Sequence, residues 1–273
     1  MDADHFIKSV NLNESTQAIL YETEQLTGKS FDFIHNSKLP VRAIVKIARS
    51  SMDHHIITYS GTDFSLLNHH IAHECGHIQR YYAAPKENRL MPVSDGQTHQ
   101  NAITDIEKYD KNFLKSLPID LRYQIIPVWI NGLIQQVTNL PSDTYIEKWI
   151  FDNYPEIRND QQQSLRQTHT EAIKTLNPKV HSQFPKIIIE SSIAMNYAFY
   201  KKIDETTGSK YFQNYKQSSI RAIGEDLYRC IGDEDRGLVA DISISNEWAR
   251  ILQIKDWFKW TDFENIPPGY GKT

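Results

Sequence analysis

Residues 73–77 are the part of the chain whose side chains point most directly to chemistry; they read His-Glu-Cys-Gly-His. On a helix, residues four apart lie one turn apart on the same face, so His73 and His77 can direct two imidazoles at one metal ion. Glu74 lies beside that face, where a carboxylate can take a proton from a water molecule on the metal. A catalytic zinc site has three protein ligands, so a third ligand must come from elsewhere in the chain.

The segment around these residues has the pattern of a helix, which this chemistry requires. Apolar side chains recur at helical spacing between residues 64 and 84, and Pro85 ends the run. Asp63 and the residues before it supply a turn and a cap. Gly76 leaves one side of the helix bare, where another backbone could approach, at a cost of about 1 kcal/mol in helix propensity. The alternative is a surface helix that carries histidines by chance.

The residues before this helix predict a small β-hairpin. Residues 41–49 alternate apolar and polar side chains, and residues 54–59 contain a run of β-branched residues. Residues 50–53 suit the turn between them. An edge strand beside a metal site can bind an extended peptide by strand addition, although a hairpin that only covers the helix fits the pattern equally well.

Most of the remaining chain has the pattern of helices separated by prolines. Residues 98–260 contain successive apolar runs at helical spacing. We expect Pro127 to kink its helix or to start it afresh. After Pro141 we expect a separate helix, with Ser142 or Asp143 as its cap.

The length and composition suit one large domain or two small ones. The chain has 273 residues, of which 40% are hydrophobic. We expect an α+β fold that is predominantly helical, with a small N-terminal hairpin or sheet feeding the metal helix and a helical region after it. Residues 1–97 would form the first part, and residues 98–273 would complete the metal site and cover the cleft, either separately or within one continuous domain.

Charge and cysteine content exclude several classes of function. The net charge is −4 with charges of both signs well mixed, so we expect no nucleic acid partner. No run approaches the roughly 18 apolar residues of a membrane span, and the N-terminus lacks the apolar core of a signal peptide. Cys75 and Cys230 are the only cysteines, which argues against a disulfide framework and favours a reducing, cytoplasmic location.

The order strand, strand, helix with His73, Glu74 and His77 resembles the zincin metallopeptidases. Within that group, residues 54–80 resemble the segment around the metal helix of ImmA/IrrE-type peptidases. The resemblance covers about residues 40–84 of the chain. It implies that the two histidines are zinc ligands, that the glutamate is the catalytic base, and that a third ligand, usually a glutamate, comes from a later helix.

Three glutamates are candidates for the third ligand. Glu147 lies in an apolar and aromatic helical run, where a buried carboxylate needs a partner. Glu107 has the spacing that the ImmA/IrrE resemblance favours, but its neighbours are charged, and Glu190 interrupts another apolar run. We predict Glu147, with Glu107 and Glu190 as alternatives. An ion pair with a lysine or arginine is the metal-free interpretation of Glu147.

Other polar residues near these candidates are assigned supporting roles. Asp143 lies one turn before Glu147 and could accept a hydrogen bond from a ligand histidine. His69 and His70 precede the motif by one turn; either could lie near the mouth of the metal site, but we expect them to be polar residues at the start of the helix. No oxyanion stabiliser can be selected, because the chain has 14 tyrosines.

The sequence therefore predicts a zinc metallopeptidase that hydrolyses peptide bonds in a protein or peptide substrate. Zinc would be held by His73, His77 and Glu147, and Glu74 would be the general base. The resemblance to ImmA/IrrE proteins implies a narrow protein target. One alternative is a catalytically idle, zincin-like regulatory or protein-binding module with structural zinc. The other is a helical interaction protein with a chance motif and no metal. The intact glutamate favours catalysis, because a structural zinc site needs no base.

Overall fold

The computed structural model describes residues 12–39, 42–60, 66–216 and 219–266, together with residues 6 and 10. The α+β, predominantly helical fold expected from the sequence is confirmed. The chain forms two compact units. The first unit comprises Met1–Leu90, Tyr145–Arg166 and Asp262–Thr273, and the second comprises Met91–Thr144 and Gln167–Thr261. Each unit contains residues from both predicted parts of the chain, 1–97 and 98–273. The division of the chain into these two parts stays a prediction.

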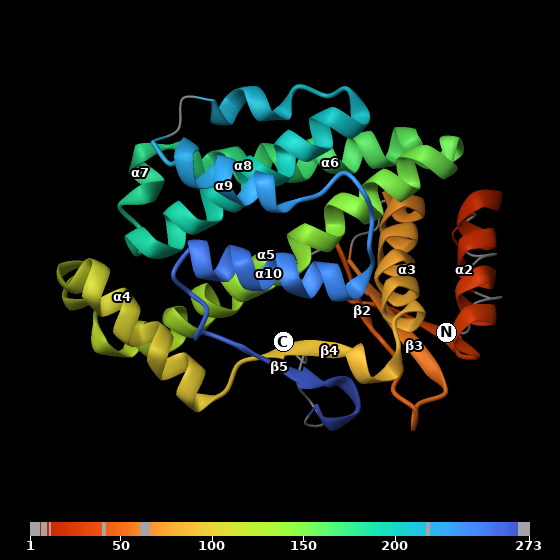
Figure 1. The fold of residues 1–273 in the computed structure, drawn as a ribbon, viewed down its shortest axis with the longest axis horizontal. Helices are drawn as coiled ribbons and strands as arrows, with labels where there is room; N and C mark the ends of the chain where they lie inside the picture. Colours follow the sequence, from red (N-terminus) through yellow and green to blue (C-terminus); the bar gives the residue numbers. More distant parts are fainter. Residues whose placement is uncertain are drawn as a thin grey trace. The chain divides into compact units, whose positions relative to one another are not determined.

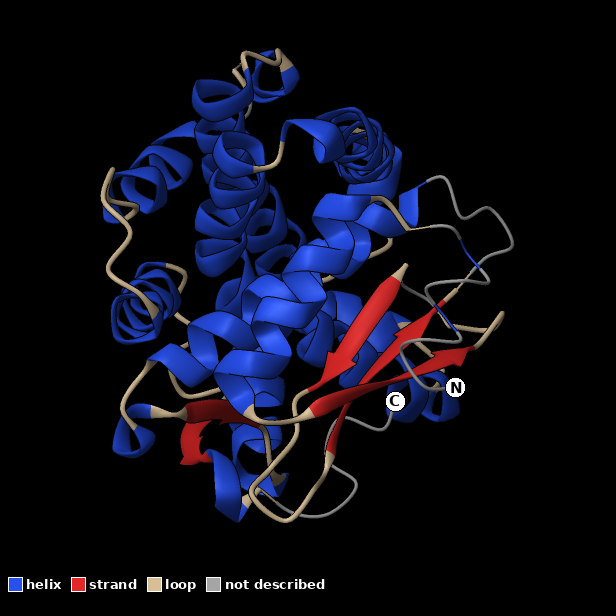
Figure 2. Ribbon diagram, turned by 90° about the vertical axis from the view of Figure 1, so that its right-hand side faces the viewer, coloured by secondary structure: helices blue, strands red, loops and turns tan. Residues whose placement is uncertain are grey.

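A three-stranded sheet lies in the first unit (Figure 2). Its strands are β1 (Ser30–His35), β2 (Ala43–Lys46) and β3 (His54–Tyr59). The order is β1-β3-β2, and β2 runs antiparallel to β3, which confirms the predicted hairpin. β1 was not predicted; it pairs parallel to β3, with Phe33 opposite Ile57. Alternate side chains of β3 are buried, as expected for a strand with one face on a core.

Two helices of the first unit pack along each other (Figure 1). They are α2 (Glu14–Thr27) and α3 (Leu67–Ala83). α2 begins at Asn13, whose side chain accepts a backbone N–H of the first turn, and ends at Gly28, which adopts a left-handed conformation with φ 65°. α3 confirms the helix predicted around the histidine motif. The predicted start of that helix near residue 64, with its cap, lies outside the described residues.

A single helix, α5 (Ile119–Asn153), runs from the second unit into the first. Pro127 and Pro141 both lie inside it, so the separate helix expected after Pro141, with a cap at Ser142 or Asp143, is wrong. The side chain of Ser142 instead donates a hydrogen bond at 2.8 Å to the carbonyl three residues earlier in the helix. A proline removes one N–H donor, and nearby hydroxyls bond carbonyls of the same turn.

The second unit contains most of the other helices and a two-stranded sheet of β4 and β5. Its longer elements are β4 (Leu90–Val93), α4 (Gly96–Ser116), α7 (Pro178–His181), α8 (Lys186–Thr207), α9 (Arg221–Cys230), α10 (Leu238–Ile251) and β5 (Lys259–Asp262). The helix α6 (Arg158–Ala172) begins in the first unit and continues into the second after Arg166. Two short 3-10 helices of the described residues, η4 (Ile173–Leu176) and η5 (Tyr211–Tyr215), lie in this unit, whereas η2 (Lys86–Asn88), η3 (Pro155–Ile157) and η6 (Phe263–Asn265) lie in the first. In the described part of the chain, no helix combines the length and apolar character needed to cross a membrane.

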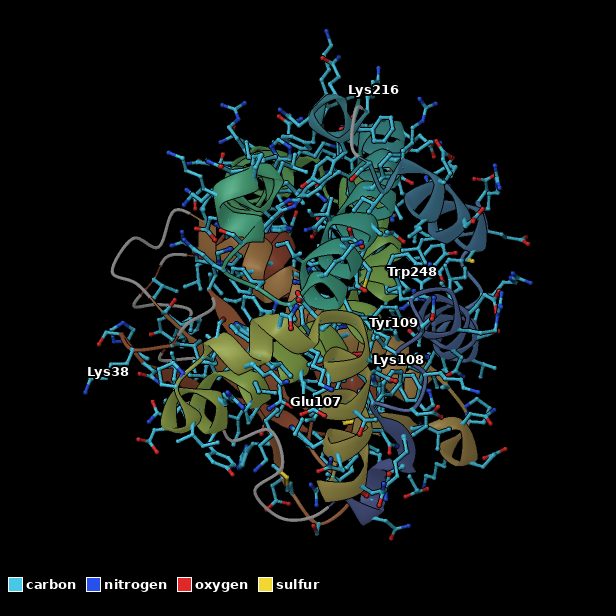
Figure 3. All side chains as sticks on the ribbon, turned by 90° about the vertical axis from the view of Figure 1, so that its left-hand side faces the viewer. Lys38, Glu107, Lys108, Tyr109, Lys216 and Trp248 are labelled. Carbon is cyan, nitrogen blue, oxygen red and sulfur yellow. The ribbon has the colours of Figure 1, made fainter. Side chains whose placement is uncertain are left out.

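Close contacts between α8, α9 and α10 build the core of the second unit. A Cβ atom on Gly224 would lie 2.5 Å from the ring of Tyr197, so α9 packs directly on this tyrosine. The indole N–H of Trp248, which is labelled in Figure 3, donates to the carbonyl of Leu227 at 2.9 Å. Trp248 is fully buried, and its one polar atom is therefore satisfied.

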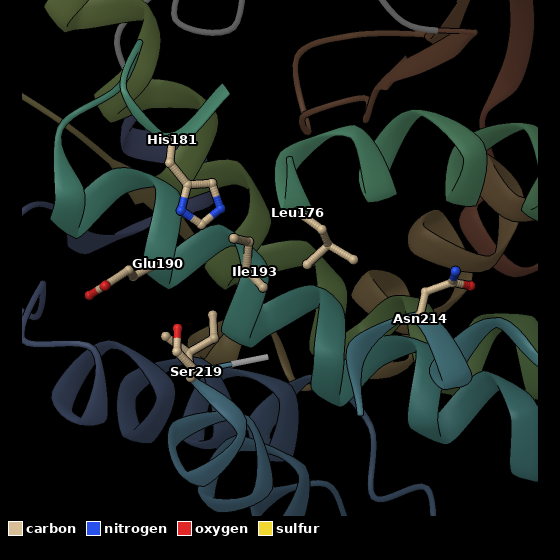
Figure 4. Close-up of a pocket in the computed structure, with 7 residues that line it drawn as sticks. Leu176, His181, Glu190, Ile193, Asn214 and Ser219 are labelled. Atoms are coloured by element: carbon tan, nitrogen blue, oxygen red, sulfur yellow. The ribbon is translucent and has the colours of Figure 1, made fainter. Parts of the chain in front are cut away.

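A cavity of about 360 Å³ also lies in the second unit (Figure 4). It is lined by Leu176, His181, Glu190, Ile193, Asn214, Ser219 and Ile220. The carboxylate of Glu190 points away from Asn214 and Leu176 in this view, and lies 3.8 Å from the ammonium group of Lys186.

Candidate metal centre

Three histidines lie along one face of α3 at spacings of one turn. The rings of His69 and His73 have centroids 6.0 Å apart, and those of His73 and His77 are 4.9 Å apart. Nε2 of His77 lies 3.2 Å from Nε2 of His73. Two nitrogen ligands of a tetrahedral zinc, each about 2.0–2.1 Å from the ion, are roughly 3.3 Å apart. The spacing of the two motif histidines therefore fits a shared zinc ion.

Glu147 of α5 lies on the other side of the His73 ring. Nδ1 of His73 is 2.9 Å from Oε1 of Glu147, and Nε2 of His69 is 3.1 Å from Oε1 and 3.0 Å from Oε2. Gln161 of α6 donates from Nε2 to Oε2 at 2.6 Å and to the Glu147 backbone carbonyl at 2.8 Å. An ionised carboxylate only accepts hydrogen bonds, so both histidine nitrogens are the donors.

The charge of Glu147 is stabilised although the side chain is almost entirely buried. Burial acts to raise its pKa, but the interactions with His69 and His73, which both direct an N–H at the carboxylate, outweigh burial and hold the pKa of Glu147 below its usual range. For His70, which contacts the hydroxyl of Ser164 at 3.1 Å, the surroundings disfavour the charged form. Burial, followed by the neighbouring histidines, lowers the pKa of His70 to about 3, so this imidazole is neutral at neutral pH.

Gly76 allows α5 to approach the motif helix closely. A Cβ atom at this position would lie 2.7 Å from Cγ2 and 3.2 Å from Cγ1 of Ile146. Ile146 immediately precedes Glu147, so the contact between the isoleucine and the glycine places the carboxylate next to His73. The bare side of the helix expected from the sequence is thus filled by a side chain of α5.

Glu74, the expected base, is half-buried on α3 beside His73. Among the described residues, no hydrogen bond or salt bridge engages its carboxylate. The group is therefore able to accept a proton, unlike Glu147, whose two oxygens already accept three N–H donors.

The structure places the three candidates for the third ligand in different surroundings. Ligand atoms of His69, His73 and Glu147 lie within 4.8 Å of one another, a group that does not include His77. Glu107 is exposed on α4 (Figure 3), and Glu190 lines the cavity of the second unit (Figure 4). Of these three glutamates, only Glu147 lies in a group of possible metal ligands with histidines among the described residues. Its role as a metal ligand stays a prediction.

The role of His69 was missed from the sequence. We expected a polar residue at the start of the helix, whereas His69 is 4% exposed and donates to both oxygens of Glu147. The available signal was its spacing: His69 precedes His73 by one helical turn and so shares the face of the motif.

Comparison with protein-family models, with curated proteins and with solved structures found no match to this chain. The geometry of the site is therefore the basis of the functional interpretation. The likeness of the motif segment to zincins stays a prediction from the sequence.

Proposed function

We propose that this protein is a zinc-dependent metallopeptidase in which His73 and His77 hold the ion and Glu74 is the general base. The observation that carries the proposal is the 3.2 Å separation of the two Nε2 atoms on α3, with an unengaged glutamate beside them. Two imidazoles at this distance fit one tetrahedral ion, and the glutamate next to them has the position that hydrolysis requires.

A bound zinc ion would act as a Lewis acid, which lowers the pKa of a water molecule and polarises a peptide carbonyl. Glu74 would accept the proton of the attacking water and pass it to the leaving amine. His73 is held by its Nδ1 proton on Glu147, which fixes the direction of its other nitrogen. The sequence prediction names Glu147 as the third ligand; in the structure its carboxylate lies against Nδ1 of His73, whereas Nε2 is the atom that lies 3.2 Å from His77.

The proposed substrate is a protein or peptide, and the proposed location is the cytoplasm. Cys75 and Cys230 are both free thiols, which suits a reducing compartment. The competing proposal is a zincin-like binding module with structural zinc and no catalysis. The unengaged carboxylate of Glu74 favours the enzyme, because a closed structural site would leave this residue without a role.

Glu74→Gln is the variant that tests the mechanism. Zinc content and hydrolysis of a peptide mixture, read as new N-termini by mass spectrometry, are compared with the wild type. We expect zinc to be retained and hydrolysis to be lost, since an amide cannot accept the proton. Glu107→Gln, the same chemical change at an exposed position on α4, is the control and should match the wild type.

Three results would contradict the proposal in different ways. An unchanged rate in Glu74→Gln would exclude the glutamate as the base. A wild type that binds zinc but cleaves nothing would support the idle module. A wild type that binds no zinc after reconstitution would leave a helical interaction protein.

A further inference from the structure

We propose that Glu147 positions His73 through its Nδ1 atom and does not bind the ion, and that His69 and Gln161 fix Glu147 in turn. This inference rests on the proposed function, because it assigns roles to the residues around the same ion. It differs from the sequence prediction, in which Glu147 completes the zinc site.

The first argument is the direction of the two nitrogens of His73. Nδ1 faces Oε1 of Glu147 at 2.9 Å, and Nε2 faces His77 at 3.2 Å. The first distance is the length of a direct N–H···O hydrogen bond and is short for two ligands of one zinc, which are roughly 3.3 Å apart. A neutral imidazole carries one proton. With that proton on Nδ1, the lone pair of Nε2 is directed to the side where His77 lies.

The second argument is the occupancy of the two carboxylate oxygens. Oε1 accepts from His73 and His69, and Oε2 accepts from His69 and Gln161. A carboxylate offers about four acceptor positions, so these donors use most of them. A metal ion on Glu147 would have to displace a buried N–H from its acceptor.

The third argument is the burial of the supporting residues. Gln161 is fully buried, Glu147 is 2% exposed and His69 is 4% exposed. Nδ1 of His69 is buried and has no hydrogen-bond partner among the described residues. The hydrogen bonds of this ring to described residues are therefore those from Nε2 to the two oxygens of Glu147. Buried side chains with several bonds to one carboxylate hold it in a single orientation, which a positioning role requires.

The inference predicts a difference between losing a ligand and losing its support. Removing a hydrogen-bond partner of a ligand histidine typically weakens metal binding about 10- to 100-fold. Glu147→Gln should therefore still bind about one zinc per chain, with a Kd about 10- to 100-fold higher than that of the wild type. His77→Ala, which removes a proposed ligand, should bind none. His69→Phe keeps the ring shape without the donor, and should also retain the ion with weakened affinity.

The experiment measures zinc affinity by chelator competition, and coordination by the visible spectrum after cobalt substitution. The same spectrum in Glu147→Gln and in the wild type is the expected result. Loss of the ion from Glu147→Gln, as in His77→Ala, would show that Glu147 is a ligand and overturn the inference while leaving the proposed function standing. A wild type that binds no ion would overturn both.

A second measurement does not depend on the metal or on any variant folding. Nitrogen-15 NMR of the metal-free wild type reports which ring nitrogen of His73 carries the proton. The inference requires a proton on Nδ1, with the low-field shift of an N–H that donates to a carboxylate. A proton on Nε2 would overturn the positioning role.

Discussion

A Cβ atom on Gly76 would lie 2.7 Å from Cγ2 of Ile146, so the contact between these two residues sets how closely α3 and α5 approach. Glu147 is the next residue, and its hydrogen bond to His73 is 2.9 Å long. The position of the carboxylate therefore depends on a glycine three residues after the histidine that it contacts.

Gly76→Ala should destabilise the protein. The new methyl group would overlap a branched side chain, and such overpacking typically costs about 1–3 kcal/mol. Alanine gains about 1 kcal/mol in helix propensity, so we expect a net loss of up to about 2 kcal/mol in the free energy of unfolding, measured by urea denaturation.

Gly132→Ala is the matched control for this substitution. Gly132 is also inside a helix, α5, and a Cβ atom there would meet no described atom within 4 Å. It should therefore gain about 1 kcal/mol from propensity alone. The double variant Gly76→Ala/Ile146→Ala should be less destabilised than the sum of its single changes. A Gly76→Ala protein as stable as Gly132→Ala would contradict the close approach.

Gln161→Leu should destabilise the protein by about 2 kcal/mol, because buried acceptors left without donors cost about 1–3 kcal/mol. The substitution removes the N–H group that serves both the backbone carbonyl and Oε2 of Glu147. Gln163→Leu makes the same change at an exposed position of α6 and should be close to neutral. Equal stability of the two variants in thermal unfolding would argue against the buried network.

His55 should make folding stability depend on pH. Nδ1 of His55 accepts the N–H of Ala48 at 3.0 Å, and Nε2 lies 3.2 Å from the hydroxyl of Thr27. Burial, with a smaller contribution from the charge of Lys29, lowers the pKa of His55 to about 4 from 6.5. A proton on Nδ1 would oppose the Ala48 N–H, so the folded protein retains the neutral ring.

The sign of this effect follows from the two pKa values. The folded pKa is below the unfolded one, so the contribution is fully present above pH 6.5 and is lost as the pH falls toward 4. Unfolding midpoints of the wild type should therefore decline more steeply over this window than those of His55→Gln, which does not titrate. Parallel curves for the two proteins would show that His55 titrates normally in the folded state.

Zinc should raise the thermal stability of the wild type and leave His77→Ala unchanged. A ligand that binds only the folded state stabilises it by about 2.7 kcal/mol at a concentration 100-fold above Kd. Differential scanning fluorimetry with zinc and then with excess chelator measures this shift. Glu107→Ala, with its side chain exposed on α4, should respond as the wild type does. A melting temperature of the wild type that is insensitive to both additions would count against a folded-state metal site.

Local patterns were enough to predict the motif helix and the hairpin. α3 and the pair β2–β3 depend on spacing within one segment, so the periodicity of their residues is sufficient. β1 was missed although Phe31 and Phe33 alternate with Ser30 and Asp32, because its parallel partner β3 is distant in the sequence. Pro141 predicted a helix break, but its neighbours continue the helix.

The candidate site was only partly predictable for a similar reason. The apolar surroundings of Glu147 indicated a buried carboxylate with a partner, and His73 is such a partner. The contribution of His69 and Gln161 depends on how α3, α5 and α6 pack against one another, which no spacing within one helix reveals. The sequence shows that His69 and Gln161 can donate hydrogen bonds, but it does not show that both lie next to Glu147 in the folded protein.

The order of chain synthesis has a consequence for the network around Glu147. His69 and Glu147 are 78 residues apart, and translation at about 5–20 residues per second separates their appearance by roughly 4–16 s. During that interval a nascent chain carries the histidines of α3 without the carboxylate that orients His73. A zinc ion that bound the chain during this interval would contact imidazole rings whose orientation is not yet fixed by Glu147. Maturation of the centre would then be completed only when the end of α5 and the start of α6 leave the ribosome.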